Sequence, residues 1–180
     1  MVSETRWRVQ EAVPDHAAQL AAMHAESFRV AYLGDDESRN HRVLAVAKDF
    51  LTPARIENRT RLIQQASERD NELYQEAINA DGEPIGLAYG SVEDRTQELM
   101  ALYVHPDYFG TGVGRELTQS FIDWCDPAQN IELGVAKNNI RAQRFYTKMG
   151  FYGLGDNRRS YYPFIPETTM IRFTGLPHDE

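Results

Sequence analysis

The sequence predicts a single α/β domain in which helices lie on the faces of a mixed β-sheet. Two observations support this prediction. Segments with the period-2 alternation of strands and segments with the apolar spacing of helices follow one another along the whole chain. The 180 residues, of which 42% are hydrophobic and 26% charged, have the size and composition of one folded domain. We expect the domain to span residues 6–174, with tails at 1–5 and 175–180.

The charge balance and the cysteine content exclude several classes of function. The formal net charge is −8. Nucleic acids and anionic membranes are bound by basic surfaces, so neither is expected as a partner. The single cysteine, Cys125, excludes an internal disulfide and a metal site built from several cysteines, so we expect no metal and a cytoplasmic location. No apolar run is long enough to span a bilayer, and the N-terminus lacks the apolar stretch of a signal peptide.

The first part of the chain is predicted to form a strand followed by helices. Residues 7–13 alternate and indicate a strand, and Asp15 can cap a helix that runs to about Tyr32. A second helical stretch follows. A third helix is expected to begin at Pro53, which suits a first helical turn, and to run to about Ser67.

The second part of the chain is predicted to hold most of the strands and two further helices. A turn at residues 80–84 joins two alternating segments and predicts a β-hairpin. One helix is expected after residue 112. Another is expected after Asn138 or Asn139, either of which can cap it, and to end at Gly150, because glycine suits a helix end. The strands expected here cover residues 73–78, 85–92, 98–104 and 131–135, with two short final strands that flank an aromatic-rich loop at 161–163.

Three glycines, Gly110, Gly112 and Gly114, lie between the strand that ends at Val104 and the next helix. Glycine permits positive φ angles, which let successive backbone amides converge on one point, and the start of a helix adds unpaired amides. Such an arrangement binds phosphate or pyrophosphate. On the glycines alone, a tight turn without a ligand is an equally good interpretation.

Neither common nucleotide motif fits this loop. A Walker loop needs Lys and then Ser or Thr after its last glycine, whereas Arg115 and Glu116 follow here. The G-x-G-x-x-G fingerprint fails in both registers, because Arg115 or Leu117 stands at its third position. A nucleotide-binding domain of either kind is therefore disfavoured.

Two stretches of the sequence carry patterns of a known family. Residues 102–117 read LYVHPDYFGTGVGREL, and residues 139–151 read NIRAQRFYTKMGF. The first resembles the acyl-CoA pyrophosphate motif, R/Q-x-x-G-x-G/A, of the GNAT superfamily of N-acetyltransferases. The second matches that family's N-x-x-A-x-x-x-Y-x-x-x-G-F pattern, and the element order over residues 6–174 is similar. One departure is that Phe109 stands at the Arg/Gln position, which we expect to weaken cofactor binding without abolishing it.

The resemblance implies a fold and a co-substrate. The fold is a mostly antiparallel twisted sheet of about seven strands with about four helices on its faces, split in a V between the fourth and fifth strands. The co-substrate is acetyl-CoA, without a metal. The residues that it implies as contacts to the cofactor are Leu102, Tyr103 and Val104 for the pantetheine arm, Gly110, Thr111, Gly112, Val113, Gly114 and Arg115 for the pyrophosphate, and Asn139 and Tyr146 near the thioester.

Tyr146 matches the family's usual general acid. After a neutral amine attacks the acetyl carbonyl, the CoA sulfur leaves as a thiolate, and a phenol within hydrogen-bond reach can protonate it. On periodicity alone, Tyr146 would be an aromatic residue on the core face of a helix, in line with Ala142 and Met149. The position in the motif favours the catalytic role.

Glu98 is the leading candidate for the general base. By period-2 alternation it shares a face with Met100, Leu102 and Val104, and apolar neighbours would raise the pKa of its carboxyl group. Some histone-acetylating members of the family place a base at the matching position. An exposed Glu at the start of a strand is the alternative interpretation.

Two other routes for the amine proton remain open. Other members of the family place a glutamate on the following strand, at a position that is Gly134 here, and its neighbour Glu132 ranks second as a base. A chain of water molecules without a single base is also possible. His105 is expected to be a turn residue, and Cys125 a packed thiol.

The resemblance thus implies an enzyme, an acyltransferase that moves the acetyl group from acetyl-CoA directly to a primary amine in a ternary complex. The acceptor is a small-molecule amine, a polyamine, or a peptide or protein amine. The acidic residues Asp35, Asp36 and Glu37, together with the net charge, suggest a cationic acceptor, or they form a solvated turn. The alternative function is a non-catalytic module that binds or senses acyl-CoA. We expect a monomer or a homodimer.

Overall fold

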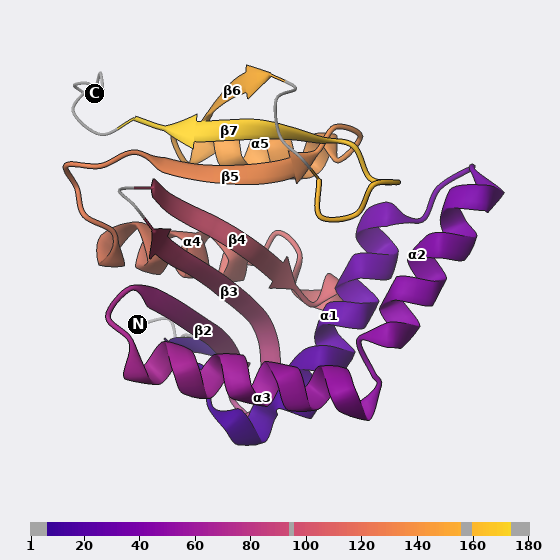
Figure 1. The fold of residues 1–180 in the computed structure, drawn as a ribbon, viewed down its shortest axis with the longest axis horizontal. Helices are drawn as coiled ribbons and strands as arrows, with labels where there is room; N and C mark the ends of the chain where they lie inside the picture. Colours follow the sequence, from indigo (N-terminus) through magenta and orange to yellow (C-terminus); the bar gives the residue numbers. More distant parts are fainter. Residues whose placement is uncertain (1–6, 94–95, 156–159, 174–180) are drawn as a thin grey trace, which may run out of the picture.

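The computed structural model describes residues 7–93, 96–155 and 160–173, so the expected tails lie outside the described residues. Within them, one seven-stranded sheet has the order β1-β2-β3-β4-β5-β7-β6 (Figure 1). All neighbouring strands are antiparallel except β4 and β5, which confirms the predicted mixed α/β fold. The strands are β1 (Trp7–Glu11), β2 (Glu72–Asn79), β3 (Pro84–Glu93), β4 (Thr96–Val104), β5 (Ile131–Ala136), β6 (Tyr152–Gly155) and β7 (Glu167–Arg172).

The described residues form five α-helices, one more than the resemblance implies. The stretch after Gly34 forms the two separate helices that the sequence predicts, and Asp36 caps the first of them by accepting a hydrogen bond from the Arg39 amide at 3.1 Å. The helices are α1 (Ala17–Tyr32), α2 (Glu37–Asp49), α3 (Pro53–Glu68), α4 (Val113–Trp124) and α5 (Ile140–Lys148), with short 3₁₀ turns η1 (Pro14–His16) and η2 (Pro106–Tyr108). No helix in this part of the chain is long and apolar enough to cross a membrane.

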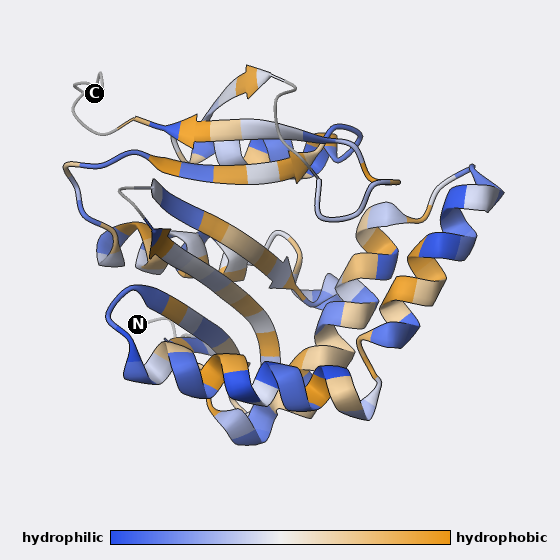
Figure 2. Ribbon diagram, in the orientation of Figure 1, coloured by the Kyte–Doolittle hydropathy of each residue, from blue (hydrophilic) through white to orange (hydrophobic). Residues whose placement is uncertain are grey.

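The two faces of the sheet are covered by different helices. Leu73 and Ala77 of β2 pack in one cluster with Phe121 of α4, whereas Tyr74 of β2 packs in another with Met23 of α1 and with α3. Side chains of β2 thus pack against α4 on one face of the sheet and against α1 and α3 on the other face. Figure 2 shows the corresponding pattern of hydropathy, with apolar residues spread through the central strands and many polar residues on α2 and α3.

The sheet splits between β4 and β5. These strands pair only from Gln97 to Leu99, opposite Ile131 to Leu133, although β4 continues to Val104 and β5 to Ala136. Figure 1 shows the two strands diverging beyond the paired end. The V-shaped split implied by the resemblance is present.

A β-bulge lies beside the split. Tyr89 of β3 is opposite Ala101, but the next residue, Gly90, is opposite Leu99, so Met100 is the extra residue in β4. Glycine is required at position 90, because a Cβ there would lie 2.3 Å from the Phe121 ring. The bulge turns β4 away from β5 at the point where their pairing stops.

This bulge corrects one expectation. Alternation placed Glu98 on the same face as Leu102 and Val104, but Leu99 packs in one cluster with those two residues. The extra residue, Met100, reverses the alternation, so Glu98 lies on the opposite face. The pattern of alternating residues is reliable only within an uninterrupted strand.

Candidate functional site

A cleft of about 720 Å³ opens where β4 and β5 separate. Its size is within the range of small-molecule sites. Its walls come from β4, from the glycine loop with the start of α4, from β5 and from one side of α5. Most of the predicted cofactor contacts lie in its lining, namely Leu102, Tyr103, Val104, Gly110, Gly112, Gly114, Arg115, Asn139 and Tyr146.

The glycine loop has the conformation that its sequence requires. Gly110 and Gly112 have φ angles of 78° and 108°, and Gly112 is the N-cap of α4. The amides of the three following residues, 113–115, are the first of the helix and so have no intrahelical acceptor. They are available to an anion at the helix start.

Two predicted contacts do not line the cleft in the described part of the chain. The Thr111 amide and hydroxyl both donate to the Tyr108 carbonyl, at 3.3 and 2.7 Å, so this amide is already used within the loop. Val113 is the first residue of α4. Its side chain is buried in the core, and its backbone amide is one of the amides at the helix start. The carboxylate of Glu116, which would repel a phosphate, accepts a hydrogen bond from the Trp7 indole at 2.6 Å.

The cleft has a positive lining although the chain is acidic. Arg115 comes from α4, and Arg141, Arg144 and Lys148 come from α5. Their spacing along α5 places the last three on one side of the helix. Four cations at one cleft, in a chain of net charge −8, fit a ligand that carries several negative charges, as the phosphates of CoA do.

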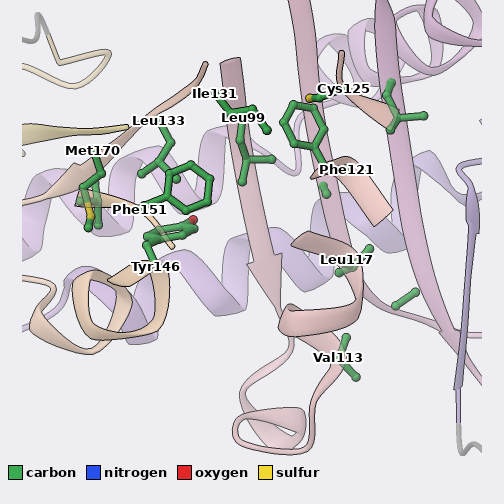
Figure 3. Close-up of a cluster of buried hydrophobic side chains, with 14 of the residues drawn as sticks. Leu99, Val113, Leu117, Phe121, Cys125, Ile131, Leu133, Tyr146, Phe151 and Met170 are labelled. Atoms are coloured by element: carbon green, nitrogen blue, oxygen red, sulfur yellow. The ribbon is translucent and has the colours of Figure 1, made fainter. Parts of the chain in front are cut away.

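Tyr146 belongs to the core and to the cleft at once. Its ring packs edge-on against Phe145 and Phe151, with centroid distances of 5.2 and 5.8 Å, and it is buried in the cluster drawn in Figure 3. Burial, with a smaller contribution from nearby Tyr32, raises the pKa of the Tyr146 phenol above its usual value. Its hydroxyl group is therefore protonated throughout the neutral and mildly alkaline range.

Asn139 caps α5. Its side-chain oxygen accepts a hydrogen bond from the Ala142 amide at 3.1 Å, which explains why Asn precedes this helix. Because the oxygen serves the helix, the side-chain amide group is the part that can donate to a ligand in the cleft.

The two carboxylates predicted as bases form one rung of the sheet. Glu98 and Glu132 are opposite each other in the paired part of β4 and β5, one residue before the strands separate. Both side chains are half-buried. Within the described residues, the cleft lining includes Leu99 and Met100 but neither glutamate.

The structure brings Glu167 into the cleft, a residue that the sequence analysis missed. Glu167 begins β7 opposite Ala136 of β5 and is the one acidic residue in the described lining. Burial raises the pKa of the Tyr32 phenol, and the negative charge of Glu167 adds to that rise. No local pattern distinguishes Glu167, because only the pairing of β7 with β5 places it there.

The remaining candidate residues are either exposed to solvent or serve the fold. Asp35, Asp36 and Glu37 are exposed, and the described cleft lining includes none of them. His105 accepts a hydrogen bond from the Asp107 amide at 3.3 Å, as a turn residue does. Cys125 is buried in the core, and burial raises the pKa of its thiol to about 12, so a thiolate nucleophile is not available there near neutral pH.

Comparison with known proteins agrees with this geometry. An uncharacterized N-acetyltransferase of Mycobacterium tuberculosis (strain H37Rv) is 37% identical over 86 residues, 42% of this chain and 54% of that protein. The chain thus spans about half the length of the curated relatives it matches. The PaiA N-acetyltransferase of Thermoplasma acidophilum, crystallised in complex with coenzyme A, superposes with a TM-score of 0.72 at 18% identity, over 92% of this chain and 98% of that one.

A second solved structure has the same fold. The ribosomal-protein-S5-alanine acetyltransferase of Vibrio fischeri superposes with a TM-score of 0.71 at 13% identity and covers 94% of both chains. At these identities the likeness shows the fold. The sequence pattern of the acetyltransferase (GNAT) family matches residues 40–151, well over half of the chain. Together with the split sheet and the glycine loop, this match shows that the chain belongs to the acetyltransferase (GNAT) family.

Proposed function

We propose that the protein transfers the acetyl group of acetyl-CoA directly to a primary amine while both substrates are bound. The observation that carries this proposal is the composition of one cleft, which combines the helix-start amides, four cations and the protonated Tyr146 phenol. The CoA complex of the Thermoplasma acidophilum protein, which shares the fold, supports the cofactor.

The end of β4 that is not paired with β5 is the proposed binding site of the pantetheine arm. Among the described residues, the edge of β4 that faces β5 has no strand partner beyond Leu99. The backbone of residues 102–104 can therefore pair with an extended, amide-bearing chain. Ser27 donates its hydroxyl to the Val104 carbonyl at 2.7 Å and holds the end of this strand against α1. The diphosphate would then reach the amides at the start of α4.

Tyr146 is the proposed general acid. When the amine attacks the acetyl carbonyl, the carbon–sulfur bond breaks, and the sulfur atom takes a proton from the phenol. The raised pKa of Tyr146 keeps that proton in place until the thiolate forms. Asn139, at the start of α5, would donate its side-chain amide near the thioester.

Two carboxylates are candidates to accept the amine's proton. We retain Glu98 as the proposed base, acting through a water molecule because its side chain is outside the cleft lining. Glu132, its neighbour across the rung, is also outside the cleft lining and ranks second. Glu167 is the acidic residue that does line the cleft, and we assign it to holding a cationic amine rather than to deprotonating it.

Thiol release from acetyl-CoA across a panel of amines tests this function. The panel should hold polyamines, an aminoglycoside, and peptides with a free N-terminus or a lysine. We expect at least one cationic amine to raise thiol release far above the rate without amine, and acetyl-CoA to raise the melting temperature. Stabilisation by acetyl-CoA without turnover on any amine would favour the non-catalytic acyl-CoA-binding module, and no stabilisation at all would contradict both.

A further inference from the structure

The guanidinium group of an arginine on α5 lies over the ring of a phenylalanine from the loop before α4. The guanidinium carbon of Arg141, at the start of α5, lies 3.7 Å from the centroid of the Phe109 ring, in the loop before α4. Both residues line the cleft. This is a close cation–π contact, of the kind that fixes the plane of an arginine head group.

The position of Arg141 is not explained by the stability of its helix. It is the second residue of α5, where the helix dipole disfavours a positive charge. No carboxylate in the described residues forms an ion pair with it. A residue that opposes a local preference without a compensating partner is a candidate for function.

Packing in the hydrophobic core does not explain the presence of Phe109 either. It is half-buried and belongs to none of the buried clusters in the described part of the chain. It stands two residues after the Asp107 turn, at the position where the glycine-loop motif usually has Arg or Gln. The position therefore carries a flat ring in place of a polar side chain, and a guanidinium from another element lies on that ring.

We propose that Arg141, held in place by the Phe109 ring, supplies the cationic contact to the CoA diphosphate that residue 109 does not make itself. This inference rests on the proposed function, because it assumes that the cleft binds CoA. The guanidinium is planar and presents several donors to phosphate oxygens, so a ring that fixes its plane also fixes the direction of those donors. The cation comes from α5 and the amides come from α4, so the diphosphate joins both walls.

The test measures the dissociation constants of CoA and of dephospho-CoA by calorimetry. Arg141→Gln removes the charge, and Phe109→Leu removes the ring while keeping an apolar side chain. We expect Arg141→Gln to weaken the binding of both ligands by about 10- to 100-fold, the range of a charge-assisted hydrogen bond, and the loss to shrink at high salt. Arg61→Gln is the matched control, because this exposed arginine on α3 lies outside the cleft lining.

The double variant tests whether the ring positions the guanidinium. If it does, Phe109→Leu weakens binding when Arg141 is present and has almost no further effect in the Arg141→Gln background. Phe109→Arg combined with Arg141→Gln should regain most of the lost affinity, because it returns a guanidinium to the same place. Losses that simply add, or a failure of this rescue in a folded variant, would overturn the positioning role.

Other outcomes separate this inference from the proposed function. A loss seen with CoA but absent with dephospho-CoA would place Arg141 on the 3′-phosphate and overturn its assignment to the diphosphate. Unchanged affinity in Arg141→Gln, with tight binding by the wild type, would overturn this inference alone. Absence of CoA binding by the wild type would overturn the proposed function as well.

Discussion

Single residues in this protein serve structure and chemistry together, and Tyr146 is the clearest example. Tyr146 is packed in the core cluster, and it is also a residue of the cleft lining. We expect Tyr146→Phe to keep the fold and lower kcat by about 10²-fold or more, with little change in KM for acetyl-CoA, because the phenol acts on the leaving sulfur. Thermal melting and thiol-release kinetics measure the two effects.

The pH dependence of kcat in the wild type is a second test of the role of Tyr146. The phenol is active in its protonated form, and burial raises its pKa above the usual value of 10.0. Its deprotonation should therefore cause no loss of kcat below about pH 10. An alkaline limb near pH 8 or 9 that disappears in Tyr146→Phe would contradict the raised pKa.

Two variants distinguish the proposed roles of Glu98 and Glu167. Glu98→Gln is expected to lower kcat by about 10²-fold, because it removes the proposed proton acceptor. Glu167→Gln is expected chiefly to raise KM for a cationic amine, because it removes a negative charge from the cleft lining. Kinetics at several pH values with one amine measure both. The reverse pattern would assign the base to Glu167.

Among the structural elements, the loop between β4 and α4 depends most on single glycines. Gly112→Ala places a Cβ on a residue with φ of 108°, which L side chains rarely adopt. We expect the free energy of unfolding to fall by about 1–3 kcal/mol and the affinity for CoA to fall with it, because the helix-start amides shift. Urea unfolding and calorimetry measure these changes.

Gly153→Ala is the control for this prediction. Gly153 lies in β6, and a Cβ there would meet no atom within 4 Å and no unfavourable φ. The control should bind CoA as tightly as the wild type. Equal effects of both substitutions would mean that the conformation of Gly112 has no special importance for the site.

A comparison of the predicted and observed elements shows what local sequence patterns can predict. The hairpin, the capping role of Asn139 and the helix after Gly112 follow from local spacing, and the structure contains all of them. The face of Glu98 did not follow, because a bulge at Met100 interrupts β4 next to Gly90, where the Phe121 ring lies close to the backbone. That approach depends on how α4 packs on the sheet, which no local pattern records.

At the scale of the whole molecule, the partly buried histidine His24 makes stability depend on pH. The His24 ring lies 4.2 Å from Phe50 and 4.0 Å from Tyr103, centroid to centroid, and its Nδ1 lies 2.9 Å from a guanidinium nitrogen of Arg59. Burial first, and then the charge of Arg59, keeps the pKa of His24 well below 6.5. The histidine is thus neutral in the folded protein near neutral pH.

This lowered pKa predicts the sign of a pH effect. Below pH 6.5, the usual pKa of histidine, the unfolded chain takes up a proton at His24 that the folded chain does not. Stability should then fall as the pH falls, by up to about 1.4 kcal/mol for each pH unit. Urea unfolding of the wild type and of His24→Gln, at about pH 7.5 and pH 5.5, measures it. An equal decrease in both proteins would remove His24 as the cause.

Local patterns predicted the order of the elements, the glycine loop, the Asn139 cap and the family, because these depend on neighbours within a few residues or on contiguous motifs. The predicted cap at Asp15 was wrong, because the 3₁₀ turn at Pro14–His16 precedes α1 and no side chain of the described residues caps that helix. Which charged side chains meet in the cleft follows only from how the chain folds. Glu167 arrives there through the pairing of β7 with β5, and Arg141 meets Phe109 across a gap that β4 and β5 leave open. Such contacts join residues far apart in the chain, and their geometry follows from how helices and strands pack rather than from local spacing.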